Sequence, residues 1–217
     1  MSMIHLSRRS VLAGSIASGI AAAAGVSPLT RPAQASTLSA RDQKLFAIAR
    51  RELEKAGTAI WRRDIVGIAD FAAHSSRPRF HFVNLDRGEV NSYLVSHGTG
   101  SDPEHDGWLN NFSNIEGSNA TSRGAYVTWE WYTGRYGTSI RLGGLDPTNN
   151  NALSRYIVMH SAGYATQDHV DRWGRLGRSN GCFAMGPDNF KLALTQLSGG
   201  RLLYADRLDL DAVIVDF

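Results

Sequence analysis

Residues 174–182 read Gly-Arg-Leu-Gly-Arg-Ser-Asn-Gly-Cys, and Cys182 is the only cysteine of the 217-residue chain. His160 ends the strand-like run at residues 155–160. A thiol with a pKa of about 8.5 is mostly protonated at neutral pH, so a nucleophilic cysteine needs a neighbouring base such as imidazole. Gly181 allows a tight turn that presents backbone N–H groups to an oxyanion. The pattern indicates a base and its nucleophile, although a lone cysteine is also common as a small buried apolar residue.

The sequence around both residues resembles the signature of the L,D-transpeptidase catalytic domain, the YkuD-like family, in which a histidine precedes Ser/Thr-His-Gly-Cys. Residues 159–164 and 174–184 are most similar to a variant branch with Gly-Arg-Leu-Gly-Arg-Ser before Gly-Cys. Further blocks occur in the order of that branch, at residues 79–85, 95–101, 113–114 and 142–145. The resemblance therefore covers roughly residues 64–205. Two positions depart from the common pattern, because Asn180 replaces a histidine and Ala184 replaces an asparagine or arginine.

The resemblance implies a mostly β fold, a sandwich or barrel of the L,D-transpeptidase type with an N-terminal helix and a short helix after Cys182. It implies that Cys182 attacks a peptidoglycan stem peptide, forms a thioester and makes 3-3 cross-links, with His160 as the base. The backbone of Gly181 would stabilise the oxyanion, and the carbonyl of Ser161 would orient His160. Neither a metal nor an organic cofactor is expected, and we expect a monomer.

Six further residues are predicted to bind substrate. Arg175 and Arg178 flank the nucleophile and can lower the pKa of the thiol or hold a substrate carboxylate. The segment near His97 and Asn114 borders the active cleft in the resembling branch. The full prediction is Asn180, Ser179, Arg178, Arg175, His97 and Asn114. The loop at residues 97–114 is otherwise expected to be solvated, although its histidines and carboxylates are also types that bind metals.

The N-terminus predicts a twin-arginine export signal over residues 1–35. Residues 7–12 read Ser-Arg-Arg-Ser-Val-Leu, a stretch of small apolar residues follows at 13–26, and Ala-Gln-Ala at 33–35 is a cleavage site. The apolar stretch is too short to cross a bilayer, which takes about 20 helical residues. We therefore expect cleavage after Ala35, a periplasmic protein, and no stable membrane insertion after cleavage.

Removal of the signal also removes the net positive charge. Residues 1–35 hold three arginines and no acidic residue, so the 23 basic residues of the chain fall to 20, equal to the 20 acidic ones. Nothing in this balance suggests a nucleic-acid partner. The single cysteine excludes an internal disulfide.

The rest of the chain predicts an N-terminal helical segment at 36–63 and a catalytic domain at 64–217. A helix is expected at 40–55, capped by Ser39 and ended by Gly57, and another at 187–197 with Pro187 in its first turn. Short β-favouring runs predict strands at 65–71, 80–85, 90–95, 125–132, 138–142, 155–160, 202–205 and 212–215.

Three alternatives remain open at this point. Water instead of an amine could open the thioester, which would make the protein an L,D-carboxypeptidase or a hydrolase of wall-linked proteins. His160 with Asp168 and His169 lies near the spacing of a zinc peptidase, although a third-ligand motif is lacking. A non-catalytic wall-binding module would explain the departures at Asn180 and Ala184.

Overall fold

The computed structural model describes residues 38–135, 137–208 and 210. Contacts divide the chain into two units, Met1–Ser36 and Thr37–Phe217, and every element described below belongs to the second unit. The predicted export signal and the strand predicted at 212–215 lie outside the described residues. None of the helices within these ranges is long and apolar enough to cross a membrane.

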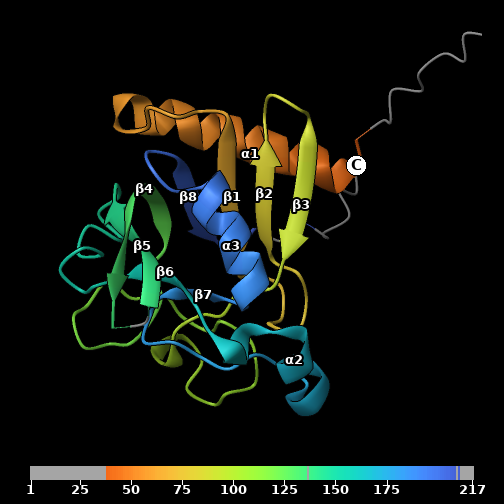
Figure 1. Cartoon of the computed structure of the whole chain (residues 1–217), viewed down its shortest axis with the longest axis vertical. Helices are drawn as coiled ribbons and strands as arrows, with labels where there is room; N and C mark the ends of the chain where they lie inside the picture. Colours follow the sequence, from red (N-terminus) through yellow and green to blue (C-terminus); the bar gives the residue numbers. More distant parts are fainter. Residues whose placement is uncertain (1–37, 136, 209, 211–217) are drawn as a thin grey trace, which may run out of the picture. The chain divides into compact units, whose positions relative to one another are not determined.

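The described strands form one mixed, curled sheet in the order β3-β2-β1-β8-β4-β5-β6-β7 (Figure 1). The strands are β1 (Ile65–Asp70), β2 (Phe80–Asn84), β3 (Glu89–Tyr93), β4 (Gly124–Gly134), β5 (Gly137–Gly144), β6 (Val158–Ser161), β7 (Phe183–Met185) and β8 (Leu202–Asp206). The helices are α1 (Ala40–Ala56), α2 (Gln167–Trp173) and α3 (Pro187–Gln196), with 3-10 turns η1 (Gly57–Ala59), η2 (Thr99–Ser101) and η3 (Gly163–Ala165). Two neighbouring pairs are parallel, β1 with β8 and β6 with β7. The predicted mostly β fold with an N-terminal helix is confirmed.

Helix α1 covers one face of the sheet. Its first turn is capped by Ser39 Oγ, which accepts the N–H of Asp42 at 3.0 Å, and the helix ends at Gly57 with φ of +54°. Buried apolar side chains recur at helical spacing and pack on β1, β2 and β8. The residues on the helix are Leu45, Phe46, Ala49 and Leu53. The helix predicted at 40–55 is therefore confirmed to within one residue.

The opposite face packs against α3, which lies in front of the sheet in Figure 1. Pro187 occupies the first turn, where its missing N–H would have no helical partner. Phe190 and Ala193 are buried in the same core cluster as Tyr126 and Phe183. Because α3 follows β7 after Gly186, this packing holds the strand that begins one residue after Cys182.

Two elements near Cys182 were not predicted from sequence. Strand β7 has three residues, and α2 has seven, so each gives too short a periodic pattern to recognise. The strand predicted at 155–160 begins instead at Val158, because residues 147–156 form successive turns that end at Tyr156 with φ of +55°.

Candidate active site

The parallel pairing of β6 with β7 brings His160 and Cys182 together. Met159 lies opposite Phe183 and His160 opposite Ala184, while Cys182 immediately precedes β7. Both side chains line one cavity of about 200 Å³. The lining residues are His160, Tyr164, Arg178, Ser179, Asn180 and Cys182. The pairing of two neighbouring strands therefore places two residues that are distant in the sequence at the same cavity.

The turn before Cys182, residues 177–182, is called the nucleophile loop below. Ser179 closes this turn on itself, since its hydroxyl donates to the carbonyl of Cys182 at 2.7 Å and accepts the N–H of Gly181 at 3.2 Å. Gly181 has φ of +109°, and a Cβ at this position would lie 2.8 Å from the carbonyl oxygen of Ala120. Only glycine fits both the conformation and the space.

The Cys182 thiol is nearly buried, with 6% of the residue exposed. Sγ lies 3.7 Å from the carbonyl oxygen of Tyr156. Burial raises the pKa of the thiol above its ordinary value, while a backbone hydrogen bond from Val158 and the charge of Arg155 partly oppose this rise. The thiol therefore rests in its protonated form at neutral pH and needs a base to become a nucleophile.

The His160 imidazole has the form that a base requires. Its Nδ1 lies 3.0 Å from the carbonyl oxygen of Ser161. Because a carbonyl can only accept, Nδ1 carries the proton and Nε2 carries the lone pair. Burial lowers the pKa of His160, and the bond to Ser161 partly opposes this. The resting pair is thus a neutral thiol and a neutral imidazole.

Three of the residues predicted to bind substrate do not line the cavity. The amide of Asn114 donates to the carbonyl of Pro147 at 3.1 Å and to the side chain of Asn150 at 2.7 Å, so it ties two loops together. Arg175 donates to the carbonyl of Trp173 at 3.4 Å. His97 is 2% exposed, and both of its ring nitrogens are hydrogen-bonded inside the protein. Arg178 does line the cavity, although Nη1 donates to the carbonyl oxygens of Asp102 and Pro103.

The loop at 97–114 is only partly the solvated loop that the sequence suggested, because residues such as Glu104, Asp106 and Asn110 are exposed while others are buried. Ser101 and Asp102 are fully buried and His97 nearly so. Buried polar groups require internal partners, which here come from the loop itself and from Arg79 and Thr121 outside it. No three potential metal ligands lie together in the described parts of the chain. His169, which the zinc alternative would need, lies in a separate cavity with Trp173 and hydrogen-bonds the carbonyl of Arg175 at 2.9 Å.

The structure adds three residues that the sequence did not single out. Tyr164 lines the cavity and belongs to the same sequence block as His160. Arg155 places its charge near Cys182 while its guanidinium binds the carbonyls of Ser113 and Ala120 at 2.7 and 2.6 Å. Tyr156 supplies the carbonyl that faces Sγ. Only Tyr164 had a sequence signal, its place in the motif.

Comparisons with known proteins found a matching family model and similar solved structures. A family model described as the L,D-transpeptidase catalytic domain matches residues 38–205. An L,D-transpeptidase from Mycobacterium smegmatis is 18% identical, with 66% of this chain and 58% of that chain covered and a TM-score of 0.40. L,D-transpeptidase 3 from Mycobacterium tuberculosis, in complex with a faropenem-derived adduct, is 13% identical, with 66% and 60% covered and a TM-score of 0.41.

A third similar structure is a variant of the helical cell shape determining protein Pgp2 from Campylobacter jejuni. It is 12% identical, with 80% of this chain and 58% of that chain covered and a TM-score of 0.42. The chain thus spans less than two thirds of the length of each of these three structures. No curated protein matches the chain.

Proposed function

Since this chain belongs to the L,D-transpeptidase catalytic domain family, we propose that it is a cysteine-dependent L,D-transpeptidase acting on peptidoglycan stem peptides. The observation that carries the proposal is the cavity shared by Cys182 and a neutral His160. A protonated thiol beside an imidazole whose Nδ1 proton is held by a carbonyl is suited to base-assisted attack.

In the proposed reaction His160 removes the thiol proton as Sγ attacks the carbonyl after the L-centre of the third stem residue. The tetrahedral intermediate collapses to a thioester, the bond to the terminal D-alanine breaks, and the imidazolium gives its proton to the leaving amine. The amine of a second stem then attacks the thioester and loses a proton to His160. Breakdown of this second intermediate forms the 3-3 cross-link and returns the proton to Sγ.

Backbone N–H groups of the nucleophile loop would hold the developing oxyanion. The N–H of Gly181 already donates to Ser179 Oγ at 3.2 Å, near the long limit of such bonds. We therefore propose that the N–H of Cys182 is the main donor to the oxyanion. The N–H of Gly181 would become a second donor when it gives up its weak hydrogen bond to Ser179 Oγ. Asn180 lines the cavity and is exposed, so its side-chain amide is available as a further donor.

A second cavity supports a reaction with two substrates. It measures about 330 Å³ and is lined by Tyr132, Arg141, Leu153, Tyr156, Ile157 and Val158. Tyr156 and Val158 also make the backbone contacts to the thiol. Because two of its lining residues also contact the thiol, we propose that this cavity receives the acceptor stem while the donor stem occupies the cavity with His160.

Transpeptidation of cell-wall stems also requires export. We propose that the twin-arginine segment at residues 1–35 directs the protein to the periplasm and is cleaved after Ala35. Replacing both Arg8 and Arg9 by lysine should leave an uncleaved cytoplasmic precursor. Normal periplasmic accumulation of that double variant would contradict the export route and leave the enzymatic proposal untouched.

The central experiment incubates the protein with disaccharide-tetrapeptides and resolves the products by mass. Dimers joined between third stem residues support the transpeptidase, whereas shortened tripeptides indicate the carboxypeptidase. Treatment with a carbapenem tests the nucleophile, because an activated thiolate should also open a strained β-lactam. One covalent adduct is expected on the wild type and none on Cys182→Ala. An unmodified wild type with a freely titratable thiol indicates a binding module instead.

A further inference from the structure

The nucleophile loop is held on both sides of Cys182 by the segment at residues 96–107, called the His97 loop here. Ser179 N–H donates to the carbonyl of His97 at 2.9 Å, and Thr99 N–H donates to the carbonyl of Ser179 at 2.7 Å. Beyond the cysteine, Ser96 N–H donates to the carbonyl of Ala184 at 2.8 Å. The position of Cys182 therefore depends on the position of the His97 loop.

The two loops also touch without side chains between them. A Cβ on Gly98 would lie 2.7 Å from both the Cα and the nitrogen of Gly181, and it would collide with the carbonyl of Asn119. The two backbones are therefore packed so closely that no side chain lies between them to absorb a displacement. A small movement of the His97 loop is thus passed directly to the residue before the nucleophile.

The His97 ring fixes this loop from inside. Nδ1 accepts from Nη2 of Arg79 at 2.8 Å, and Nε2 lies 3.1 Å from the carboxylate of Asp102. Because Arg79 can only donate, Nδ1 carries the lone pair and Nε2–H donates to Asp102. The same carboxylate accepts the N–H groups of Asp106 and Gly107, each at 3.0 Å.

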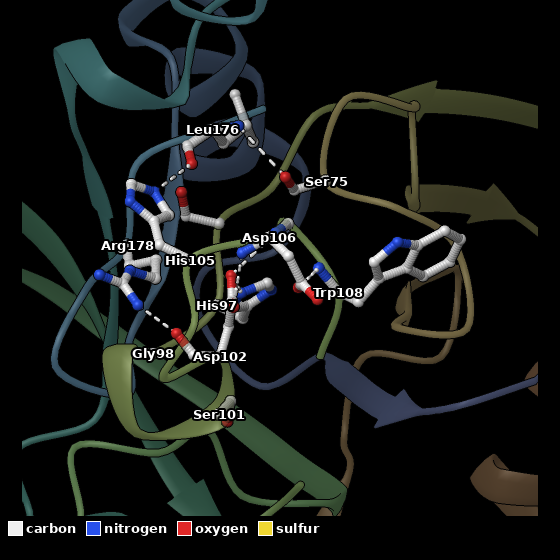
Figure 2. A network of polar contacts seen from close by, with 12 residues as sticks. Ser75, His97, Gly98, Ser101, Asp102, His105, Asp106, Trp108, Leu176 and Arg178 are labelled. Carbon is white, nitrogen blue, oxygen red and sulfur yellow. Dashed lines mark hydrogen bonds and ion pairs between the residues drawn. The ribbon is translucent and has the colours of Figure 1, made fainter. Parts of the chain in front are cut away.

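Arg79 anchors the chain of contacts in the core. It is fully buried, and its guanidinium donates to the carbonyl of Val95 at 3.1 and 3.0 Å and to that of Ala73 at 2.9 Å. At the other end Arg178, from the nucleophile loop, donates to the carbonyl of Asp102 (Figure 2). Together these contacts form a continuous chain of hydrogen bonds from the core, through His97 and Asp102, to the loop that carries Cys182.

We propose that His97 is a positioning residue for the nucleophile. The Arg79–His97–Asp102 chain holds the His97 loop, and this loop sets the placement of Ser179, Gly181 and Cys182. His97 acts from behind the loop and does not contact substrate, unlike the role that the family resemblance implies. The inference rests on the proposed function only in that acylation of Cys182 is one of its two readouts.

The test compares wild type and His97→Ala in two measurements. The first is carbapenem acylation of Cys182, resolved into a maximal rate constant and a half-saturating concentration. The second is amide hydrogen exchange of residues 177–184, which does not depend on chemistry at the thiol. A displacement of about 1 Å at a reacting centre can lower a rate by about 10²-fold. We expect the maximal rate constant to fall about 10- to 100-fold, an unchanged half-saturating concentration, and faster exchange.

His81→Ala is the matched control. His81 is also fully buried, with Nδ1 2.8 Å from Ser92 Oγ and Nε2 3.4 Å from a guanidinium nitrogen of Arg41, but it lies on β2 facing α1. It should lose stability as His97→Ala does and keep the wild-type rate constant. Should His97→Ala not fold, His97→Asn keeps a polar atom near the Nδ1 position, and we expect a fall of about 3- to 10-fold.

The outcomes separate this inference from the proposed function. A higher half-saturating concentration with an unchanged rate constant would show that His97 contacts substrate and would overturn the positioning role. Equal losses of rate in His97→Ala and His81→Ala would overturn it as well. If the wild type is not acylated, the proposed function fails, and faster exchange at 177–184 in the His97 variant alone still supports the positioning role, whereas unchanged exchange overturns it.

Discussion

The face of the sheet beneath α1 and the region around the nucleophile loop are both buried, but different interactions hold them. Beneath α1, Leu45, Ala49 and Leu53 pack on apolar strand residues, and this packing tolerates small shifts. Around Cys182, buried polar groups and close backbone contacts fix the chain. A directional hydrogen bond or a backbone contact specifies position more sharply than apolar burial does. The first region should therefore govern stability, and the second should govern reaction rate.

His160→Ala should separate the effect on reaction rate from the effect on stability most sharply. Loss of the base should lower the rate constant for carbapenem acylation by about 10²- to 10⁴-fold, or about 3–5 kcal/mol in the barrier. The free energy of unfolding should change far less, because His160 lies at the edge of a cavity. Stopped-flow acylation and urea unfolding give the two values. Activity that is lost to a chelator and restored by zinc would instead revive the metal-dependent alternative.

The reverse pattern is expected for Leu45→Ala beneath α1. Leu45 is fully buried, so removal of its side chain should lower the free energy of unfolding by about 2–5 kcal/mol. The acylation rate constant of the folded protein should stay at the wild-type value. Urea unfolding followed by fluorescence and acylation at 20 °C below the melting midpoint would check this. A rate loss above about tenfold would show that the α1 face also positions Cys182.

Acid should weaken both regions, because each contains a buried neutral histidine. Burial is the largest cause that lowers the pKa of His81 and of His97, each to about 3. The folded pKa of each histidine lies below its unfolded value near 6.5. The stability that each buried neutral histidine contributes is therefore fully present above pH 6.5 and is lost as the pH falls toward 3. Between pH 6.5 and 4.5 the titration of each histidine should lower the free energy of unfolding by up to about 1.4 kcal/mol per pH unit.

His81→Asn checks this assignment, since it removes one of the titrating histidines and leaves the others in place. Urea unfolding at several pH values should give a shallower slope for the variant than for the wild type. An identical slope in both proteins would mean that His81 does not bind its proton on unfolding. The acylation rate of the folded variant at pH 7 should remain that of the wild type.

The smallest predicted effect comes from Gly181→Ala. The added methyl would meet the carbonyl of Ala120 and Cδ1 of Ile157, each 2.8 Å away, at a φ that favours glycine. We expect the acylation rate constant to fall about tenfold and the free energy of unfolding to fall by about 1–3 kcal/mol. Gly174→Ala is the control, because Gly174 has a similar positive φ of +70° but nothing within 4 Å. Gly174→Ala should lose a similar free energy of unfolding and keep the wild-type acylation rate constant.

Local patterns in the sequence predicted the elements that apolar packing governs. Helix α1 was placed to within one residue, because Ser39, Gly57 and the spacing of Leu45, Ala49 and Leu53 all agree. Helix α3 followed in the same way from Pro187. The short elements β7 and α2 were missed, since three and seven residues carry almost no periodic signal.

The cavity also contains residues that the sequence predicted and residues that only the structure revealed. Cys182, His160 and the residues before the cysteine were named from the motif, and the structure brings most of them together. Asn114 was placed in the cleft by resemblance, yet its amide binds Asn150. Arg155 carried no signal, because its closeness to Cys182 arises from packing between loops. A motif identifies residue types, while the partners of a polar group depend on which segments meet.

By itself the sequence determined the helix periods, the glycine turn before Cys182 and the family to which the chain belongs. These properties are local, because they depend on backbone conformations and on spacing along the chain. Only the tertiary structure decided that His97 lies behind the nucleophile loop, held between Arg79 and Asp102. The physical reason is burial: a histidine has the same sequence signal in water and in the core, and its charge and hydrogen bonds are fixed only when distant segments enclose it.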